Sequence, residues 1–168
     1  MKAVVLDTSA FIQGYNFTDP ATEHYTVPLV RSEIRDEIAL IRFESALSSG
    51  RIVVVTPTEA SVRRLEEEAR SFGESKALSE TDKQLLALAV DLKLQGREPT
   101  VVSDDFSVQN TAKKLGVAYS GRAYRITKEL RWVIYCPGCK RRFAEPQEDG
   151  VCPICGTELK RKPEKPRT

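Results

Sequence analysis

Four cysteines form two equally spaced pairs near the C-terminal end of the 168-residue chain. Both pairs have the pattern Cys-Pro-x-Cys, and 12 residues separate them. Two tight turns are a compact way to supply the four thiolates that a tetrahedral Zn²⁺ ion binds. The spacing therefore predicts one structural zinc ion with no open coordination position, and its ligands are Cys136, Cys139, Cys152 and Cys155.

Carboxylates follow closely on two apolar segments elsewhere in the chain. Asp7 comes directly after Lys2–Leu6. The pair Asp104 and Asp105 comes shortly after Thr100–Val102. If both segments are strands of a parallel sheet, their carboxyl ends meet at the edge where ligands bind in open α/β folds. The sequence therefore predicts that these carboxylates share one crevice.

Two further carboxylates are expected at the same edge, because helix N-termini lie along it. Glu33 falls in the first turn of the helix predicted after the break at Pro28, and Asp82 falls in the first turn of the helix that carries Leu85–Leu92. Each carboxylate also has a purely structural interpretation. Asp82 completes a capping box with Ser79, Glu33 favours the helix dipole, and a strand-end Asp can form a turn. The argument for a ligand site rests on their joint placement.

Several carboxylates in one crevice repel one another unless a cation neutralises them. Hard oxygen ligands select Mg²⁺ or Mn²⁺, which can polarise a phosphate oxygen and lower the pKa of an attacking water. The only histidine is His24, and the cysteines are engaged elsewhere, so no serine–histidine or cysteine–histidine pair is available. These residue types predict metal-assisted hydrolysis of a phosphodiester.

The elements that must position these side chains alternate between short strands and helices. This alternation predicts an α/β fold in which helices cover both faces of a parallel sheet. We expect an α/β domain over residues 1–122, a connector over 123–134, a zinc ribbon over 135–159 and a disordered basic tail over 160–168. The tail prediction rests on five Lys and Arg and two Pro in nine positions, with no apolar residue.

The composition fits a chain that folds in water, with 40% hydrophobic residues, 30% charged residues and a net charge of +2. The charge is uneven, because residues 126–168 carry 10 Lys and Arg against 6 Asp and Glu, whereas the first 125 residues have a net charge of −2. This asymmetry suits a protein that holds metal ions in one part and a polyanion in another. The apolar runs are too short for a membrane span or a signal peptide, so we expect a cytoplasmic protein.

Over residues 1 to about 120 the chain resembles a known family. Segments 4–11, 80–82, 85–89 and 101–106, together with Glu33, are similar to the PIN domain of metal-dependent ribonucleases. The resemblance implies a PIN-like sheet sandwiched by helices and a catalytic Mg²⁺ or Mn²⁺ site at Asp7, Glu33, Asp82 and the Asp104–Asp105 pair. The family pattern favours Asp105 as the ligand, and Ser103 stands where a hydroxyl can hydrogen-bond a carboxylate or a phosphate.

A PIN-like domain followed by such a ribbon resembles the Nob family of endoribonucleases in its archaeal form, and residues 104–110 (DDFSVQN) strengthen the likeness. The resemblance implies cleavage of precursor ribosomal RNA at the 3′ end of small-subunit (16S-type) rRNA, within an assembling small subunit. Two alternatives are a toxin-type PIN ribonuclease acting on tRNA or mRNA and a non-catalytic RNA-binding assembly factor. The absence of a ribbon from most such toxins, and the four filled acidic positions here, count against them. The oligomeric state is not indicated.

A basic strip, defined here as Lys140, Arg141 and Arg142, follows the first cysteine pair and precedes Phe143. Cations beside an aromatic ring can hold phosphates and stack a base. Phe143 could equally fill the small core of the ribbon while the cations face outward. In both cases we expect the basic strip to bind RNA.

Overall fold

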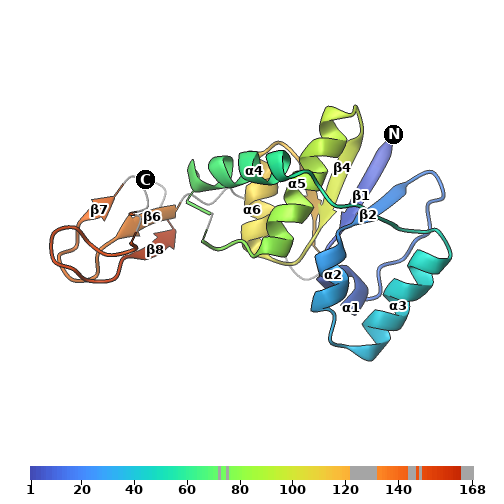
Figure 1. The fold of residues 1–168 in the computed structure, drawn as a ribbon, viewed down its shortest axis with the longest axis horizontal. Coiled ribbons are helices and arrows are strands. Elements are labelled where there is room, and N and C mark those ends of the chain that lie inside the picture. Colours follow the sequence, from blue (N-terminus) through green and yellow to red (C-terminus); the bar gives the residue numbers. More distant parts are fainter. Residues whose placement is uncertain (72, 75, 122–131, 144–146, 148, 164–168) are drawn as a thin grey trace.

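The computed structural model describes residues 1–71, 73–74, 76–121, 132–143, 147 and 149–163. These residues form an α/β body and a small β ribbon that stands at one end of it (Figure 1). In these parts of the chain we find no helix with the length and hydrophobicity needed to cross a membrane.

The body is built on a five-stranded parallel sheet with the order β3-β2-β1-β4-β5. Its strands are β1 (Lys2–Leu6), β2 (Glu23–Thr26), β3 (Val53–Val54), β4 (Glu98–Val102) and β5 (Ala118–Ser120). The central strands β1 and β4 pair with Leu6 opposite Val102, so the chain leaves both strands at the same level of the sheet. The α/β fold and its parallel sheet confirm the sequence prediction.

Helices flank this sheet (Figure 1). In the described residues they are α1 (Thr8–Ile12), α2 (Pro28–Glu33), α3 (Glu37–Ser48), α4 (Glu59–Ser71), α5 (Glu80–Leu94) and α6 (Phe106–Lys114). The core helix is α5, which contacts β1, β4, α4 and α6. Its apolar residues are buried nearly all round, as expected of a helix enclosed by other elements.

The start of α5 is fixed by the capping box that the sequence predicts. The Ser79 side chain accepts a hydrogen bond from the backbone N–H of Asp82, and the Asp82 side chain accepts one from the backbone N–H of Ser79. Two N–H groups that the helix cannot satisfy internally are therefore paired. The box fixes the position of Asp82, whose charge is one of the causes that raise the pKa of Asp7 at the end of β1.

The helix predicted after the break at Pro28 is instead two helices, α2 and α3. Asp36 begins the second helix, because its Oδ1 accepts a hydrogen bond from the backbone N–H of Ala39 at 2.7 Å. Ile34, the residue that follows α2, is extended and buried, so the chain turns between the helices. Glu33 consequently lies at the C-terminal end of α2, and its predicted place in a first helical turn is wrong.

The ribbon is a three-stranded antiparallel sheet with the order β7-β6-β8. Its strands are β6 (Trp132–Tyr135), β7 (Arg142–Phe143) and β8 (Lys160–Pro163). The prediction of disorder for the tail is therefore wrong for residues 160–163, because backbone pairing with β6 offsets the repulsion within a basic segment. Residues 164–168, and residues 123–131 of the predicted connector, lie outside the described residues.

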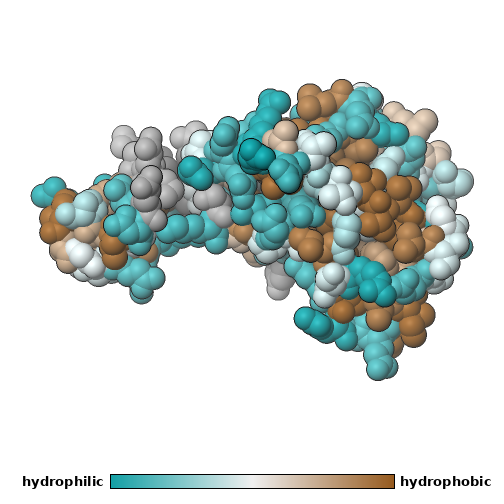
Figure 2. All heavy atoms as spheres, in the orientation of Figure 1, coloured by the Kyte–Doolittle hydropathy of each residue, from teal (hydrophilic) through white to brown (hydrophobic). Residues whose placement is uncertain are grey.

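The hydropathy of the body surface differs from one region to another. Figure 2 shows hydrophilic residues over α4, the body helix nearest the ribbon. Apolar residues reach the surface farther away, around α3, where Ile38 and Ile41 are exposed.

Candidate active site and metal centre

Asp7 lies at the end of β1, where its side chain also caps α1. Its Oδ1 accepts the backbone N–H of Thr8 at 2.6 Å. Its Oδ2 accepts the hydroxyl of Ser103 at 2.7 Å and that of Ser9 at 3.3 Å. The contact between Ser103 and a carboxylate confirms the prediction made for that hydroxyl.

Glu33 is exposed and is held by two threonines from different helices. Thr8 Oγ1 donates to Oε2 at 3.1 Å, and the buried Thr81 Oγ1 donates to Oε1 at 2.6 Å. The structure therefore brings Glu33 beside Asp7 and Asp82 by a route that the sequence did not predict. Thr8 and Thr81 each flank a predicted carboxylate, and this adjacency is the signal that could have identified them.

Asp82 has both of the roles considered for it. Its Oδ2 takes part in the capping box, whereas no group among the described residues donates to its Oδ1. Burial raises the pKa of Asp82, and the neighbouring carboxylates of Asp105 and Glu33 raise it further. The cap thus leaves one oxygen available in a negatively charged setting.

Asp104 and Asp105 differ clearly in their surroundings. Asp105 is exposed and caps α6, accepting the backbone N–H of Ser107 at 2.7 Å. Asp104 is half-buried and accepts a hydrogen bond from the side chain of Gln13, a contact that the sequence did not reveal. The charge of Asp105 is one of the causes that raise the pKa of Asp82, so Asp105 lies near that carboxylate.

The electrostatics at this edge favour a cation. Burial raises the pKa of Asp7 from 3.8 to about 6, and Asp82 adds to the rise. Among the described residues, no three carboxylates have ligand oxygens that all lie within 4.8 Å of one another. Carboxylate oxygens are the ligands that Mg²⁺ and Mn²⁺ prefer, so the carboxylates at this edge have the donor chemistry to hold such an ion.

The four cysteines meet the requirements of a tetrahedral metal site. Their Sγ atoms all lie within 4.8 Å of one another, with 3.3 Å between Cys136 and Cys155 and 3.6 Å between Cys139 and Cys152. A Zn–S distance of 2.3 Å corresponds to S···S distances of about 3.8 Å. The neighbouring thiols act on one another, because hydrogen bonding to Thr157 lowers the pKa of Cys155 whereas burial and hydrogen bonds to the other three cysteines raise that of Cys139.

The two cysteine turns have equivalent backbones. Lys140 and Gly156 follow the second cysteine of each pair and donate their N–H groups to the carbonyls of Cys136 and Cys152, at 3.0 and 2.9 Å. Both residues have positive φ, 63° at Lys140 and 69° at Gly156. The chain therefore accepts backbone strain at Lys140 to form the same turn that glycine forms easily.

The basic strip lies on the outside of the ribbon. Lys140, Arg141 and Arg142 are exposed, and none of them has an ion-pair partner among the described residues. Phe143 is half-buried and stands opposite Ile134 in the pairing of β6 with β7. This arrangement leaves the three cations available to an anionic ligand while Phe143 packs in the ribbon.

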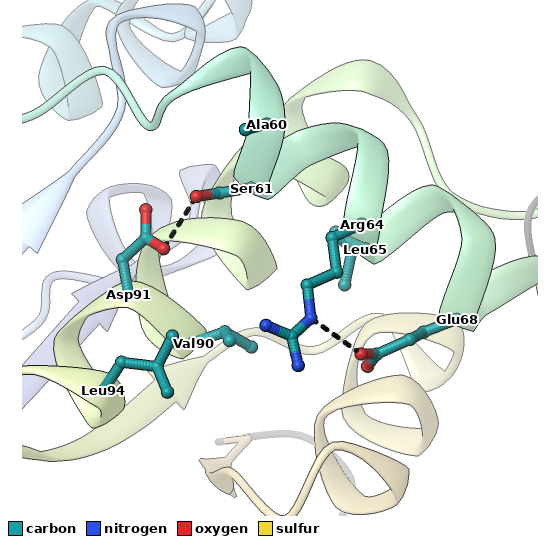
Figure 3. Close-up of a pocket in the computed structure, with 8 residues that line it drawn as sticks. All are labelled: Ala60, Ser61, Arg64, Leu65, Glu68, Val90, Asp91 and Leu94. Atoms are coloured by element: carbon teal, nitrogen blue, oxygen red, sulfur yellow. Dashed lines mark hydrogen bonds and ion pairs between the residues drawn. The ribbon is translucent and has the colours of Figure 1, made fainter.

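A groove of about 170 Å³ runs between α4 and α5 (Figure 3). None of the carboxylates predicted to bind the catalytic metal lines it. Ser61 donates to Asp91 across it at 2.8 Å, and Arg64 pairs with Glu68 on one wall at 3.4 Å. The polar groups that face it are thus engaged with one another. The groove adds no member to the acidic site.

Comparison with known proteins gives one family match and several relatives. Residues 4–92 match the family described as PIN domain of ribonuclease. "Endoribonuclease Nob1" of Pyrococcus abyssi is 39% identical over 165 residues, which cover 98% of this chain and 96% of that protein. "20S-pre-rRNA D-site endonuclease nob1" of Schizosaccharomyces pombe is 33% identical over 93 residues, 55% of this chain and 24% of that protein.

A relative with a different name also matches. "Ribonuclease VapC3" of Aeropyrum pernix is 39% identical over 124 residues, 74% of this chain and 88% of that protein. The Pyrococcus match covers 98% of this chain and therefore spans both the body and the ribbon, whereas the Aeropyrum match covers 74% of it.

Proposed function

The chain belongs to the PIN-domain ribonucleases and, within them, to the Nob1 endoribonucleases, and we propose that it cleaves precursor ribosomal RNA to form the 3′ end of small-subunit (16S-type) rRNA. The observation that carries the proposal is the similarity to the Pyrococcus endoribonuclease across both body and ribbon. The yeast relative, named for 20S pre-rRNA, supports this substrate class. The partners are then precursor rRNA and the assembling small subunit, in the cytoplasm, where thiolates stay reduced.

In this proposal Asp7, Glu33, Asp82 and Asp105 hold a Mg²⁺ or Mn²⁺ ion at the end of β1 and β4. When bound, such an ion would polarise a phosphate oxygen and lower the pKa of the attacking water. Thr8, Thr81 and Ser103 orient the carboxylates through their hydroxyls. The support is the raised pKa of Asp7 and Asp82, which a divalent cation would relieve.

The ribbon contributes binding rather than chemistry. Its four thiolates would occupy all four coordination positions of a tetrahedral zinc ion, which leaves no position for a substrate. The exposed basic strip then supplies contacts to RNA phosphates outside the acidic site. This division matches the charge of the chain, because a negative body cannot attract RNA by itself.

Cleavage of a precursor RNA that spans the 3′ end of 16S-type rRNA tests the proposal. We expect one cut, at the mature end, in Mn²⁺ or Mg²⁺ and none in EDTA. Asp82→Asn should abolish the cut, whereas the matched variant Asp91→Asn should keep it. Asp91 is a half-buried carboxylate of the same helix, but it bonds Ser61 in the groove of Figure 3.

Other outcomes identify the alternatives. Cleavage of tRNA or mRNA, with the precursor left intact, would assign the protein to the toxin-type ribonucleases. Tight binding of the precursor without a cut in any divalent ion would make it a non-catalytic assembly factor. An Asp82→Asn variant that cuts as fast as the parent would place the catalytic metal elsewhere.

A further inference from the structure

A second buried carboxylate lies outside the acidic site. Glu74 follows α4, and its side chain is fully buried, with 0% exposed. Its Oε1 accepts the side-chain amide of Asn110 at 2.5 Å. A buried carboxylate needs such partners, because an uncompensated charge away from water is strongly unfavourable.

Glu74 also meets a cation that comes from the ribbon. Nη1 of Arg161, the second residue of β8, lies 3.3 Å from Glu74 Oε2 and donates to the carbonyl of Gly73 at 3.2 Å. The Arg161 side chain is 30% exposed, so the guanidinium is partly withdrawn from water. A residue 87 positions away in the chain therefore joins the ribbon to the body.

The surroundings of this pair form a seam between the two parts. A small cavity of about 100 Å³ lies there, lined by Gly73 and Lys76 from the body and by Ile134, Leu159, Lys160 and Arg161 from the ribbon. Figure 1 shows β8 beside the end of α4, in agreement with this contact. The ribbon thus rests against the body at the turn that leads from α4 to α5.

Helix α6 links this contact to the acidic site. Asn110 lies on α6, the helix that Asp105 caps. The neighbouring Gln109 donates its side-chain amide to the carbonyl of Ser103 at 2.8 Å. One helix therefore connects the ribbon contact at one point with the carboxylate edge at another.

We propose that Arg161 and Glu74 form a latch that seats the ribbon on the body and so holds the basic strip at a set distance from the catalytic carboxylates. Arg161 is then a positioning residue for RNA, in addition to the phosphate contacts of the strip. This role rests on the proposed ribonuclease function, whereas the latch itself does not. A seated ribbon raises the effective concentration of the acidic site around an RNA already bound by the strip.

The latch is tested first without RNA, by ¹⁵N relaxation of the zinc-loaded full chain. The parent should show one rotational correlation time for body and ribbon. Arg161→Gln should give the ribbon amides a shorter correlation time while the zinc content stays at one ion. The matched control Lys162→Gln should behave like the parent, since it removes the same charge from a side chain that stacks on Tyr135, 4.5 Å from its ring centroid. Equal correlation times in the parent and in Arg161→Gln would overturn the latch.

The positioning role is tested by cleavage of two RNAs. For a precursor long enough to reach the ribbon, Arg161→Gln should raise KM about tenfold with little change in kcat. For a short RNA that occupies only the acidic site, the variant should match the parent. Glu74→Gln should reproduce both results, which would exclude a direct contact of Arg161 with RNA, because Glu74 is buried. If the KM of each variant equals that of the parent for the long RNA as well as for the short one, the positioning role is wrong.

The test of the latch and the test of the proposed function can fail independently. If the parent cuts no ribosomal precursor, the proposed function is wrong, yet the correlation times still decide the latch. If Glu74→Gln unfolds the body, the comparison of Arg161→Gln with Lys162→Gln remains decisive, because both residues lie on β8 of the ribbon.

Discussion

The hydroxyl of Ser103 donates to the carboxylate of Asp7 at 2.7 Å, although 96 residues separate them in the chain. The contact follows from the register of the two central strands, in which Leu6 stands opposite Val102. It is one of the interactions that lower the pKa of Asp7 against the larger effect of burial. The hydroxyl thus helps to keep a buried carboxylate ionised for a metal ion.

Ser103→Ala should therefore raise the pKa of Asp7 above its value of about 6. Carboxyl ¹³C NMR titration of the protein without added divalent ions measures this pKa. The matched variant Ser9→Ala should cause a smaller rise, because its hydroxyl lies 3.3 Å from the same oxygen. Equal pKa values in parent and Ser103→Ala would show that the contact is not formed in solution.

Asp7→Asn should stabilise the protein at neutral pH when no catalytic ion is bound. Because burial raises the pKa of Asp7 from 3.8 to about 6, the folded state binds the proton more tightly than the unfolded chain. The stability that this group contributes is present below pH 3.8 and is lost as the pH rises through 6. The shift corresponds to at most about 3 kcal/mol at pH 7, less where water reaches the group.

Chemical unfolding from about pH 5 to pH 7, where the thiolates keep the zinc bound, checks this after other divalent ions are removed. The parent should lose stability across the range relative to Asp7→Asn. Added Mn²⁺ should raise the Tm of the parent but not that of the variant. A variant less stable than the parent at pH 7 would contradict the argument.

Thr81→Val should weaken metal binding without unfolding α5. Thr81 is buried, and valine has a similar shape, but Glu33 then keeps only the longer contact from Thr8, at 3.1 Å. We expect Mn²⁺ affinity to fall roughly tenfold, the equivalent of one hydrogen bond to a charged group. Calorimetric titration measures the affinity, and Thr81→Ser should restore it. Full affinity in the valine variant would mean that Glu33 needs no positioning by Thr81.

Cys152→Ser should release the metal of the ribbon and unfold that part alone. The ribbon has too small a core to fold without its ion, whereas the body has its own core. Elemental analysis should find no zinc, and amide spectra should lose the dispersed signals of β6, β7 and β8. One retained zinc ion with an unchanged ribbon spectrum would refute the site.

Replacement of the whole basic strip by alanine should weaken RNA binding at low salt. Each lost phosphate contact lowers the slope of log affinity against log salt by about one. Binding of the precursor across a salt series measures this slope. A triple variant with the affinity and slope of the parent would mean that the strip serves another partner. Mn²⁺ affinity at the acidic site should stay the same throughout.

The sequence predicts the elements of this fold better than their ends. Asp7 and the Asp104–Asp105 pair could be placed because an apolar strand precedes each, and strand ends are a local feature. Glu33 was misplaced because the break before α3 depends on the cap at Asp36, which competes with a continuous helical pattern. The hydroxyl contacts join residues from different elements, and no local pattern encodes them.

In the ribbon, too, local features could be predicted from the sequence and tertiary contacts could not. The cysteine spacing predicts its metal site directly, because the turns are local. The composition of residues 160–168 indicates disorder, yet β8 forms because β6 pairs with it and Glu74 receives Arg161. Tertiary partners thus override composition in this segment, and the partner of Arg161 lies outside the ribbon.

The pairing of β1 with β4 has a consequence for how the chain is made. The central strand of the sheet receives its second neighbour from residues 98–102, nearly a hundred positions later. Closing so long a loop is slow compared with forming a local hairpin or helix. A nascent chain therefore leaves the ribosome with β1 incompletely paired until β4 has emerged. The nuclease edge is among the last features of the body to form during translation.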